Sequence, residues 1–142
     1  MKRLFLLAAA AALSACQPSD GETFPGDASE TQPYAGIAED AVLRITGTEP
    51  FWGGTISGGQ LTWTTPENID GITVPVERFA GRGGLSFSGQ LEDQQIDIAI
   101  TPGDCSDGMS DRTYPFNATV ELNGQTLSGC AWREGVDELA EA

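Results

Sequence analysis

The chain of 142 residues is long enough for one domain and short for two. It contains 21 acidic and seven basic residues, no histidine, and a single lysine at position 2. A surface of this charge repels nucleic acids and anionic lipid head groups, so we expect binding to neither. The lack of histidine removes the side chain that most often acts as a general base near neutral pH.

The first 15 residues have the pattern of a secretory signal peptide. A basic start, Met1 to Arg3, precedes an apolar run from Leu4 to Leu13 that is too short to span a membrane. The sequence Leu13-Ser14-Ala15-Cys16 matches the lipobox of bacterial lipoproteins. We therefore expect cleavage before Cys16, acylation of its thiol, and attachment to a membrane through the lipid. Gln17 after the cysteine favours the outer membrane, with the domain in the periplasm.

The remainder of the chain divides into three parts by composition. Residues 16–40 are rich in Pro, Gly, Ser, Thr and acidic residues, which predicts a flexible acidic tether behind the lipidated cysteine. Residues 41–133 form the predicted β-domain. Residues 134–142 are expected to be a short acidic tail.

Alternation of apolar and polar residues predicts strands throughout residues 41–133, and no helical periodicity is present. In chain order, strands are expected at 42–46, from 51, 61–64, 72–78, 85–87, 96–100, 114–122 and 126–132. Ser57-Gly58-Gly59-Gln60 and Asn123-Gly124 are hairpin signals. Pro75 predicts an edge strand or a bulge, because proline has no N–H to donate.

These elements predict an all-β fold: a single antiparallel meander of about eight short strands. An open sheet would expose two edges, so we expect a closed or strongly curled barrel. If Cys16 carries the lipid, Cys105 and Cys130 remain, and an even pair in an exported domain predicts one disulfide. A redox-active or metal-binding pair is the alternative, disfavoured by the long spacing.

Two motifs resemble those of a known group of proteins. Gly47-Thr48-Glu49-Pro50-Phe51-Trp52 has the form G-x-E-P-F-W, and Cys105 to Pro115 reads C-S-D-G-M-S-D-R-x-Y-P, with Gly129-Cys130-Ala131 near the end. Together they resemble a family of small uncharacterised bacterial envelope lipoproteins. Their module is often found beside META-type heat-shock lipoprotein domains or membrane-bound lysozyme-inhibitor domains. The resemblance implies an envelope lipoprotein with a compact β-domain and implies no reaction.

The first motif allows two interpretations. Phe51 and Trp52 are expected to anchor the core at the start of a strand, with Glu49 paired to Arg112 of the second motif. Alternatively, the aromatic side chains line a small binding pocket in which Glu49 is the polar group.

The second motif places several polar candidates in one loop. Asp104, Asp107 and Asp111 surround Gly108 in a manner faintly similar to a calcium loop, but without the terminal glutamate of an EF-hand. Asp and Ser also favour loops because they hydrogen-bond to their own backbone, so we assign no metal site. The candidate binding residues are Glu49, Trp52, Asp107, Asp111, Arg112 and Tyr114.

The sequence therefore predicts a non-enzymatic, membrane-anchored binding or structural module without a cofactor and most simply a monomer. Removal of Lys2 and Arg3 with the signal peptide leaves five arginines against 21 acidic residues, a net charge of −16. This charge favours a cationic envelope or host protein as partner. Two alternatives remain: inhibition of a basic hydrolase such as lysozyme, and a calcium-dependent envelope module.

Overall fold

The computed structural model describes residues 31–137, which belong to one compact unit starting at Thr31. The predicted signal peptide, Cys16, the first part of the tether and the last five residues lie outside the described residues. Within residues 31–137 there is no helix long and apolar enough to cross a membrane.

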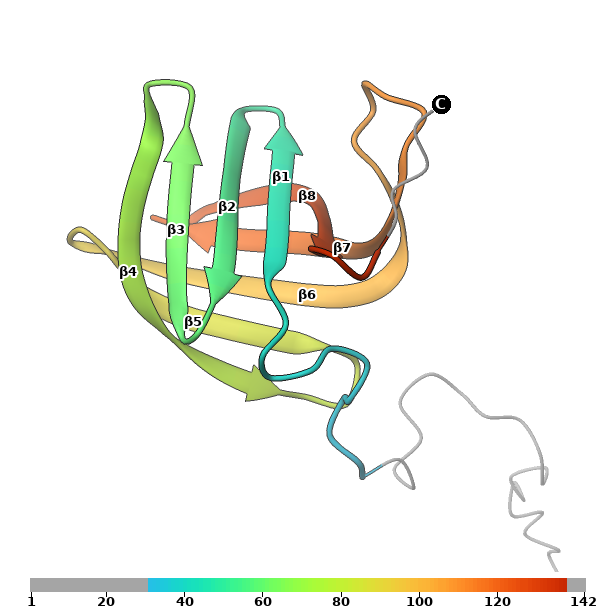
Figure 1. The fold of residues 1–142 in the computed structure, drawn as a ribbon. Helices are drawn as coiled ribbons and strands as arrows, with labels where there is room; N and C mark the ends of the chain where they lie inside the picture. The colour runs from blue at the N-terminus through green and yellow to red at the C-terminus, as the bar shows by residue number, and fades with distance from the viewer. Residues whose placement is uncertain (1–30, 138–142) are drawn as a thin grey trace, which may run out of the picture. The chain divides into compact units, whose positions relative to one another are not determined.

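The expected all-β meander is confirmed, and it closes into a barrel (Figure 1). Each strand pairs antiparallel with the next, and β8 pairs with β1. The strands are β1 (Leu43–Thr48), β2 (Phe51–Ser57), β3 (Gln60–Thr65), β4 (Asn68–Ala80), β5 (Leu85–Leu91), β6 (Gln94–Ser106), β7 (Thr113–Leu122) and β8 (Gln125–Arg133). A barrel of eight strands has an interior just wide enough to be filled by side chains.

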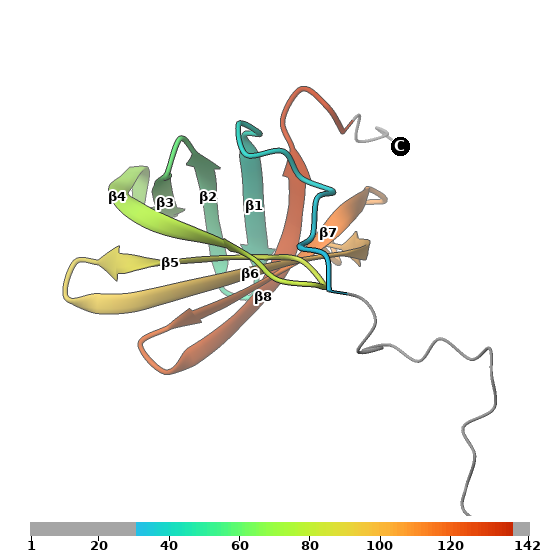
Figure 2. The ribbon, with the colours of Figure 1, turned by 90° about the horizontal axis from the view of Figure 1, so that it is seen from below.

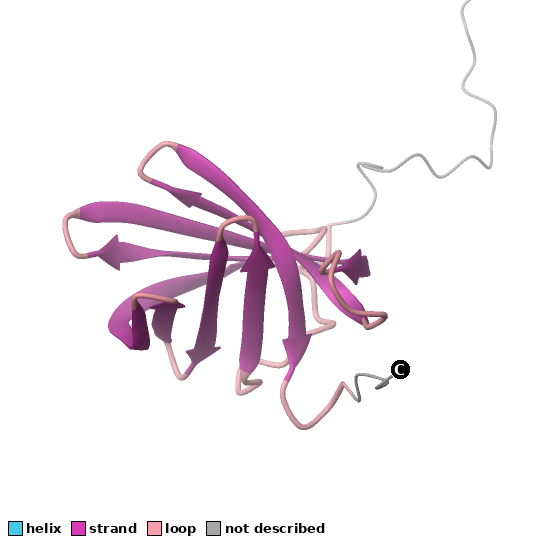
Figure 3. Ribbon diagram, turned by 90° about the horizontal axis from the view of Figure 1, so that it is seen from above, coloured by secondary structure: helices cyan, strands magenta, loops and turns pink. Residues whose placement is uncertain are grey.

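The barrel has two halves whose strands cross. β1 to β3 run together on one side, and β5 to β8 run across them on the other, while the long strand β4 joins the two halves (Figures 1 and 2). At one end of β2 and β3 lie the β1–β2 and β3–β4 turns, and at the other end lies the β2–β3 turn (Figures 1 and 3). We call the end with the β1–β2 and β3–β4 turns the turn end. The opposite end, with the β2–β3 turn, is the N-terminal end.

Alternate residues of every strand fill the interior, as the period of two predicts. In β6, for example, Ile96, Ile98 and Ile100 are almost fully buried, and Asp97 between them is not. No charged or polar residue among those described is buried. The interior is therefore an apolar core.

Tight turns with left-handed backbone set the register of two hairpins. Gly58 and Gly59 have φ of +57° and +75°, and Asn123 and Gly124 have φ of +52° and +73°. Two successive positive φ angles match the right-handed twist of the flanking strands. Both hairpin signals in the sequence are thus confirmed.

The proline in β4 does not occupy an edge, because the closed barrel has none. Pro75 pairs with Gln60 of β3, and the next residue, Val76, pairs with Gly89 of β5. Pro75 therefore stands where β4 passes from one partner strand to the other. Val76 donates its N–H to the carbonyl of Gly59 at 2.9 Å, so the backbone hydrogen bonding continues past the proline.

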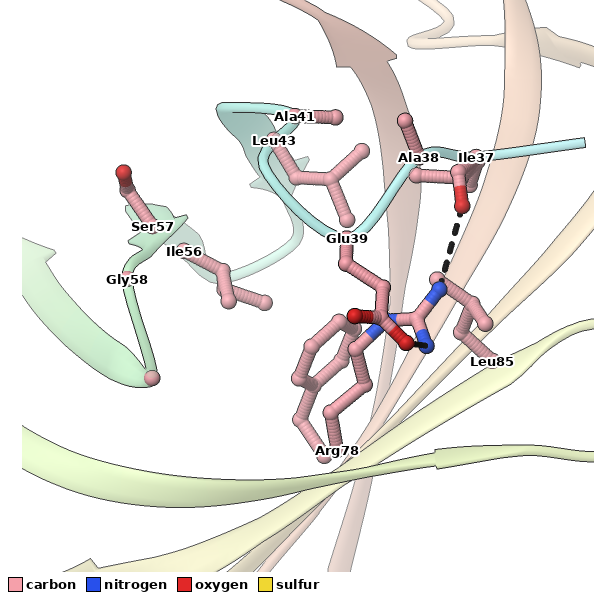
Figure 4. Close-up of a pocket in the computed structure, with 12 residues that line it drawn as sticks. Ile37, Ala38, Glu39, Ala41, Leu43, Ile56, Ser57, Gly58, Arg78 and Leu85 are labelled. Carbon is pink, nitrogen blue, oxygen red and sulfur yellow. Dashed lines mark hydrogen bonds and ion pairs between the residues drawn. The ribbon is translucent and has the colours of Figure 1, made fainter.

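The folded unit begins before residue 41, where the composition placed the end of the tether. Ile37 is 2% exposed and packs against the core at the N-terminal end, with Tyr34 and Ala41 beside it. Arg78 donates a hydrogen bond to the carbonyl of Ile37 at 3.0 Å, and Arg133 donates one to the carbonyl of Gly36 at 3.1 Å. Figure 4 shows this segment lying across the mouth of the barrel, with Arg78 beneath it. A composition typical of disorder was outweighed by one buried isoleucine and two arginine–carbonyl contacts.

The expected disulfide is also confirmed. Cys105 in β6 and Cys130 in β8 are bonded, and together with Tyr114 and Trp132 they form a second small core outside the barrel. The bond joins residues 25 positions apart, and closing a loop of this length stabilises the fold by about 3.5 kcal/mol in the chain-entropy description.

The start of the acidic tail is held in place. Asp137 accepts hydrogen bonds from the N–H and the guanidinium of Arg133, at 2.6–3.0 Å.

Candidate functional site

The β6–β7 loop, which carries most of the second motif, is organised around one carboxylate. Asp107 Oδ1 accepts hydrogen bonds from the N–H groups of Met109 and Ser110, at 2.9 and 2.8 Å. Its Oδ2 accepts from the hydroxyls of Ser110 and Tyr114, at 2.8 and 3.0 Å. The spacing D-x-M-S allows this because an aspartate readily bonds the backbone two and three residues ahead. Both oxygens of Asp107 are engaged within the loop.

These bonds shift two pKa values in opposite directions. Donation by the backbone N–H groups of Ser110 and Met109, and by the Ser110 hydroxyl, holds the pKa of Asp107 well below its usual value. Burial, together with the hydrogen bond to the Asp107 carboxylate, raises the pKa of Tyr114. Around neutral pH the pair is a carboxylate and a neutral phenol, an arrangement suited to holding a loop in shape.

The two motifs meet in the structure. Thr48, next to the β1–β2 turn, donates its hydroxyl to the carbonyl of Asp107 at 3.1 Å. Glu49 is exposed on that turn, and Asp111 is exposed on the loop. Arg112 is partly buried, and its expected ion pair with Glu49 stays a prediction.

Trp52 is buried, as expected of a core anchor. Its ring leaves no room for a side chain at Gly47 or Gly129, the glycines of two motif segments. Its ring stacks on Trp63 with centroids 5.1 Å apart. A Cβ at Gly47 would lie 2.2 Å from the indole Nε1, and a Cβ at Gly129 would lie 2.7 Å from Cζ2. The indole therefore occupies space that only glycine leaves free. Its N–H is the one buried side-chain polar atom without a hydrogen-bond partner in the described residues.

Phe51, also predicted to be in the core, is instead 55% exposed. Because side chains alternate across a strand, only one of two successive residues can face inward, and here it is Trp52. Near it, a bulge in the β3–β4 pairing follows Trp63. Gly71 in the bulge has φ of +79°, and Ile69, two residues earlier in the same bulge, is 81% exposed. Bulges of this kind redirect side chains.

Phe51 and Ile69 border open hollows at the turn end. One hollow, of about 450 Å³, has a mostly apolar wall. It is lined by Pro50, Phe51, Trp52, Trp63, Thr65, Pro66, Glu67, Leu122, Gln125 and Leu127. A shallower hollow next to it is bordered by Phe51, Pro66 and Ile69. At the N-terminal end, the space beneath Ile37 and beside Arg78 is only about 30 Å³, room for about one water (Figure 4).

The acidic residues of the second motif are spread along the β6–β7 region. Among residues 31–137, no three His, Cys, Asp or Glu side chains come together in an arrangement that could hold a metal ion. Both carboxylate oxygens of Asp107 are directed into its own loop. The hydrogen bonds of Asp107 are of the kind that aspartate commonly forms with the backbone in turns.

Three of the six candidate residues have structural roles, whereas Glu49 and Asp111 are exposed and Arg112 is partly buried. Asp107 and Tyr114 hold the β6–β7 loop, and Trp52 holds the barrel wall. Phe51 lines a hollow, which fits the alternative interpretation of the first motif rather than the core position expected first, and the exposed Pro66 and Ile69 were not predicted. A signal existed for Ile69, because Glu67-Asn68-Ile69-Asp70-Gly71 places one isoleucine among turn-forming residues.

The chain matches no model of a protein family, no curated protein and no solved structure.

Proposed function

We propose that the protein is a lipoprotein anchored through Cys16 to the bacterial envelope, at the outer membrane and facing the periplasm, and that its barrel binds a partner protein without catalysis. The observation that carries the binding role is the hollow at the turn end. It combines an apolar wall, including Phe51 and the Trp52–Trp63 pair, with one acidic lining residue, Glu67. We call Glu67, together with Glu49 before Pro50 and Asp70 after Ile69, the acidic rim. Concave apolar surfaces with a few polar groups are typical binding sites.

The absence of catalysis is supported by how the reactive groups are used. Asp107, the carboxylate with the most strongly shifted pKa, has its oxygens occupied by loop donors. Cys105 and Cys130 are bonded to each other and offer no thiolate. A turnover activity lost in Asp107→Asn without unfolding would contradict this part of the proposal.

The anchor is tested by mass spectrometry of the native protein. We expect the mature chain to begin at Cys16 and to carry acyl groups on that residue. An uncleaved or unmodified N-terminus would contradict the lipoprotein assignment.

The binding role is tested by photo-crosslinking in intact envelopes. A photoreactive amino acid at Pro66, an exposed residue on the wall of the hollow, is expected to give a discrete protein adduct. The matched control is the same amino acid at Phe79, which is exposed near the far end of β4. No adduct at position 66, or the same adducts at both positions, would refute the role.

Inhibition of a basic hydrolase such as lysozyme is a second candidate, favoured by the acidic rim. Residues 45–76 include three acidic side chains, Glu49, Glu67 and Asp70, and no basic one. Such a surface attracts cationic proteins at low ionic strength. Lysozyme activity that is unchanged by an excess of the purified lipoprotein at low salt would exclude this candidate.

A further inference from the structure

Two exposed apolar side chains stand together at the turn end. Phe51 projects from the outer face of β2, and the bulge in β4 holds Ile69 out from the barrel, so that both border one shallow hollow with Pro66. A Cβ at Gly71 would lie 2.8 Å from the carbonyl oxygen of Trp63, so the bulge depends on glycine at this point. We call Phe51, Pro66 and Ile69 the turn-end patch. Contiguous exposed apolar residues with a polar border often mark interaction sites.

The charged residues that flank the turn-end patch in the sequence are all acidic. Glu49 precedes Pro50 in the β1–β2 turn, and Glu67 and Asp70 flank Ile69 in the β3–β4 region. The nearest arginine before Glu49 in the sequence is Arg44. It lies at the other end of β1 and is ion-paired with Glu134 at 3.4 Å. The β6–β7 loop, which carries Arg112, lies on the other side of the β1–β2 turn from the β3–β4 turn (Figure 1).

The negative charge beside the patch favours one kind of binding partner over the others. A second copy of the chain would place like charges against each other, and an anionic membrane surface would be repelled in the same way. A basic polypeptide segment suits both the apolar surface of the patch and its negative border. Its apolar side chains cover Phe51 and Ile69, while its Lys or Arg side chains meet the acidic rim.

We infer that the turn-end patch binds a basic polypeptide segment that also carries apolar side chains. This inference rests on the proposed partner-binding function and gives it a site and a partner chemistry. Phe51 and Ile69 supply the apolar contact, and Glu67 and Asp70 supply the charge complementarity.

The test measures binding of short fluorescent peptides to the full-length lipoprotein in a nonionic detergent. The probes are a peptide of alternating lysine and leucine, one of lysine and serine, and one of glutamate and leucine. We expect the Lys/Leu peptide to bind most tightly, and Phe51→Ser or Ile69→Ser to weaken it about tenfold. Both side chains are exposed, so these variants should fold, and a thermal melt checks that they do.

Matched controls separate the patch from general acidity. Phe79→Ser replaces an exposed phenylalanine near the far end of β4 and should leave binding unchanged. Glu67→Gln with Asp70→Asn should weaken binding at low salt, and Glu77→Gln should not. Equal losses in Phe51→Ser and Phe79→Ser would overturn the inference. So would binding of Phe51→Ser that equals the wild type, or a Phe51→Ser effect confined to self-association or to anionic vesicles.

Failure here is distinguishable from failure of the proposed function. A crosslinked partner at Pro66 whose capture survives Phe51→Ser and Ile69→Ser would leave the binding role intact and remove this site. Absence of any crosslinked partner, together with no peptide binding, would remove both.

Discussion

The fit of Trp52 against two glycines gives the sharpest prediction about stability. A methyl group at Gly47 would lie 2.2 Å from Nε1 and 2.3 Å from Cε2 of the indole. The ring cannot move aside easily, because it is buried and stacked on Trp63. A methyl group at Gly129 would lie 2.0 Å from the backbone oxygen of Thr46 as well as close to the ring.

We therefore expect Gly47→Ala to lower the free energy of unfolding by about 3 kcal/mol, the upper part of the range for overpacked cores. Gly129→Ala should cost more, because backbone must shift. For a domain of this size, a loss of this magnitude lowers Tm by about 15 °C. Gly83→Ala is the control: no atom lies within 4 Å of its Cβ position, and its effect should be within about 0.5 kcal/mol.

The assay is urea unfolding followed by Trp fluorescence, with Trp52→Phe as a second background. A phenyl ring lacks the outer part of the indole, so Gly47→Ala should cost at least about 1 kcal/mol less in that background. Gly129→Ala should keep most of its cost, because the clash with the Thr46 carbonyl remains. Additive effects of Gly47→Ala and Trp52→Phe would refute this account of the packing.

The remaining predictions concern the N-terminal segment, the loop and the disulfide. Ile37→Ala should cost about 2–4 kcal/mol and expose residues 31–41 to protease, and unchanged protection would contradict the packing of Ile37. The pKa of Asp107 is lowered on folding, so its stabilisation is complete above its unfolded pKa of about 4 and is lost as pH falls; urea titrations should show a weaker acid dependence in Asp107→Asn. The pKa of Tyr114 is raised on folding, so its contribution to the free energy of unfolding is complete below pH ~10 and is lost as the pH rises further. The tyrosinate absorbance of Tyr114 should appear at a higher pH than that of an unperturbed tyrosine, and Tyr114→Phe should remove this component. Reduction of Cys105–Cys130 should lower stability by about 3.5 kcal/mol, and an unchanged urea midpoint would exclude a stabilising role.

Much of the candidate site could not be predicted, because residue type does not say which face of a strand points inward. Phe51 and Trp52 are adjacent and both apolar, and the register of β2 against β1 and β3 placed one inside and one outside. Asp107 looked like a ligand for a metal or a partner. Its bonds to Met109, Ser110 and Tyr114 instead use it to shape the loop.

Local chemistry in the sequence was sufficient for the barrel itself. Alternation fixes which residues share a face, and Asn123-Gly124 and Gly58-Gly59 select tight hairpins. With Cys16 set aside as the predicted lipid site, Cys105 and Cys130 are the pair that remains. Only the tertiary structure decided that Ile37 closes one end and that Ile69 stands exposed on a bulge at the other. The position of Ile37 depends on contacts with Arg78 and the core, which lie far from it in the chain, and that of Ile69 depends on where the β3–β4 pairing shifts its register.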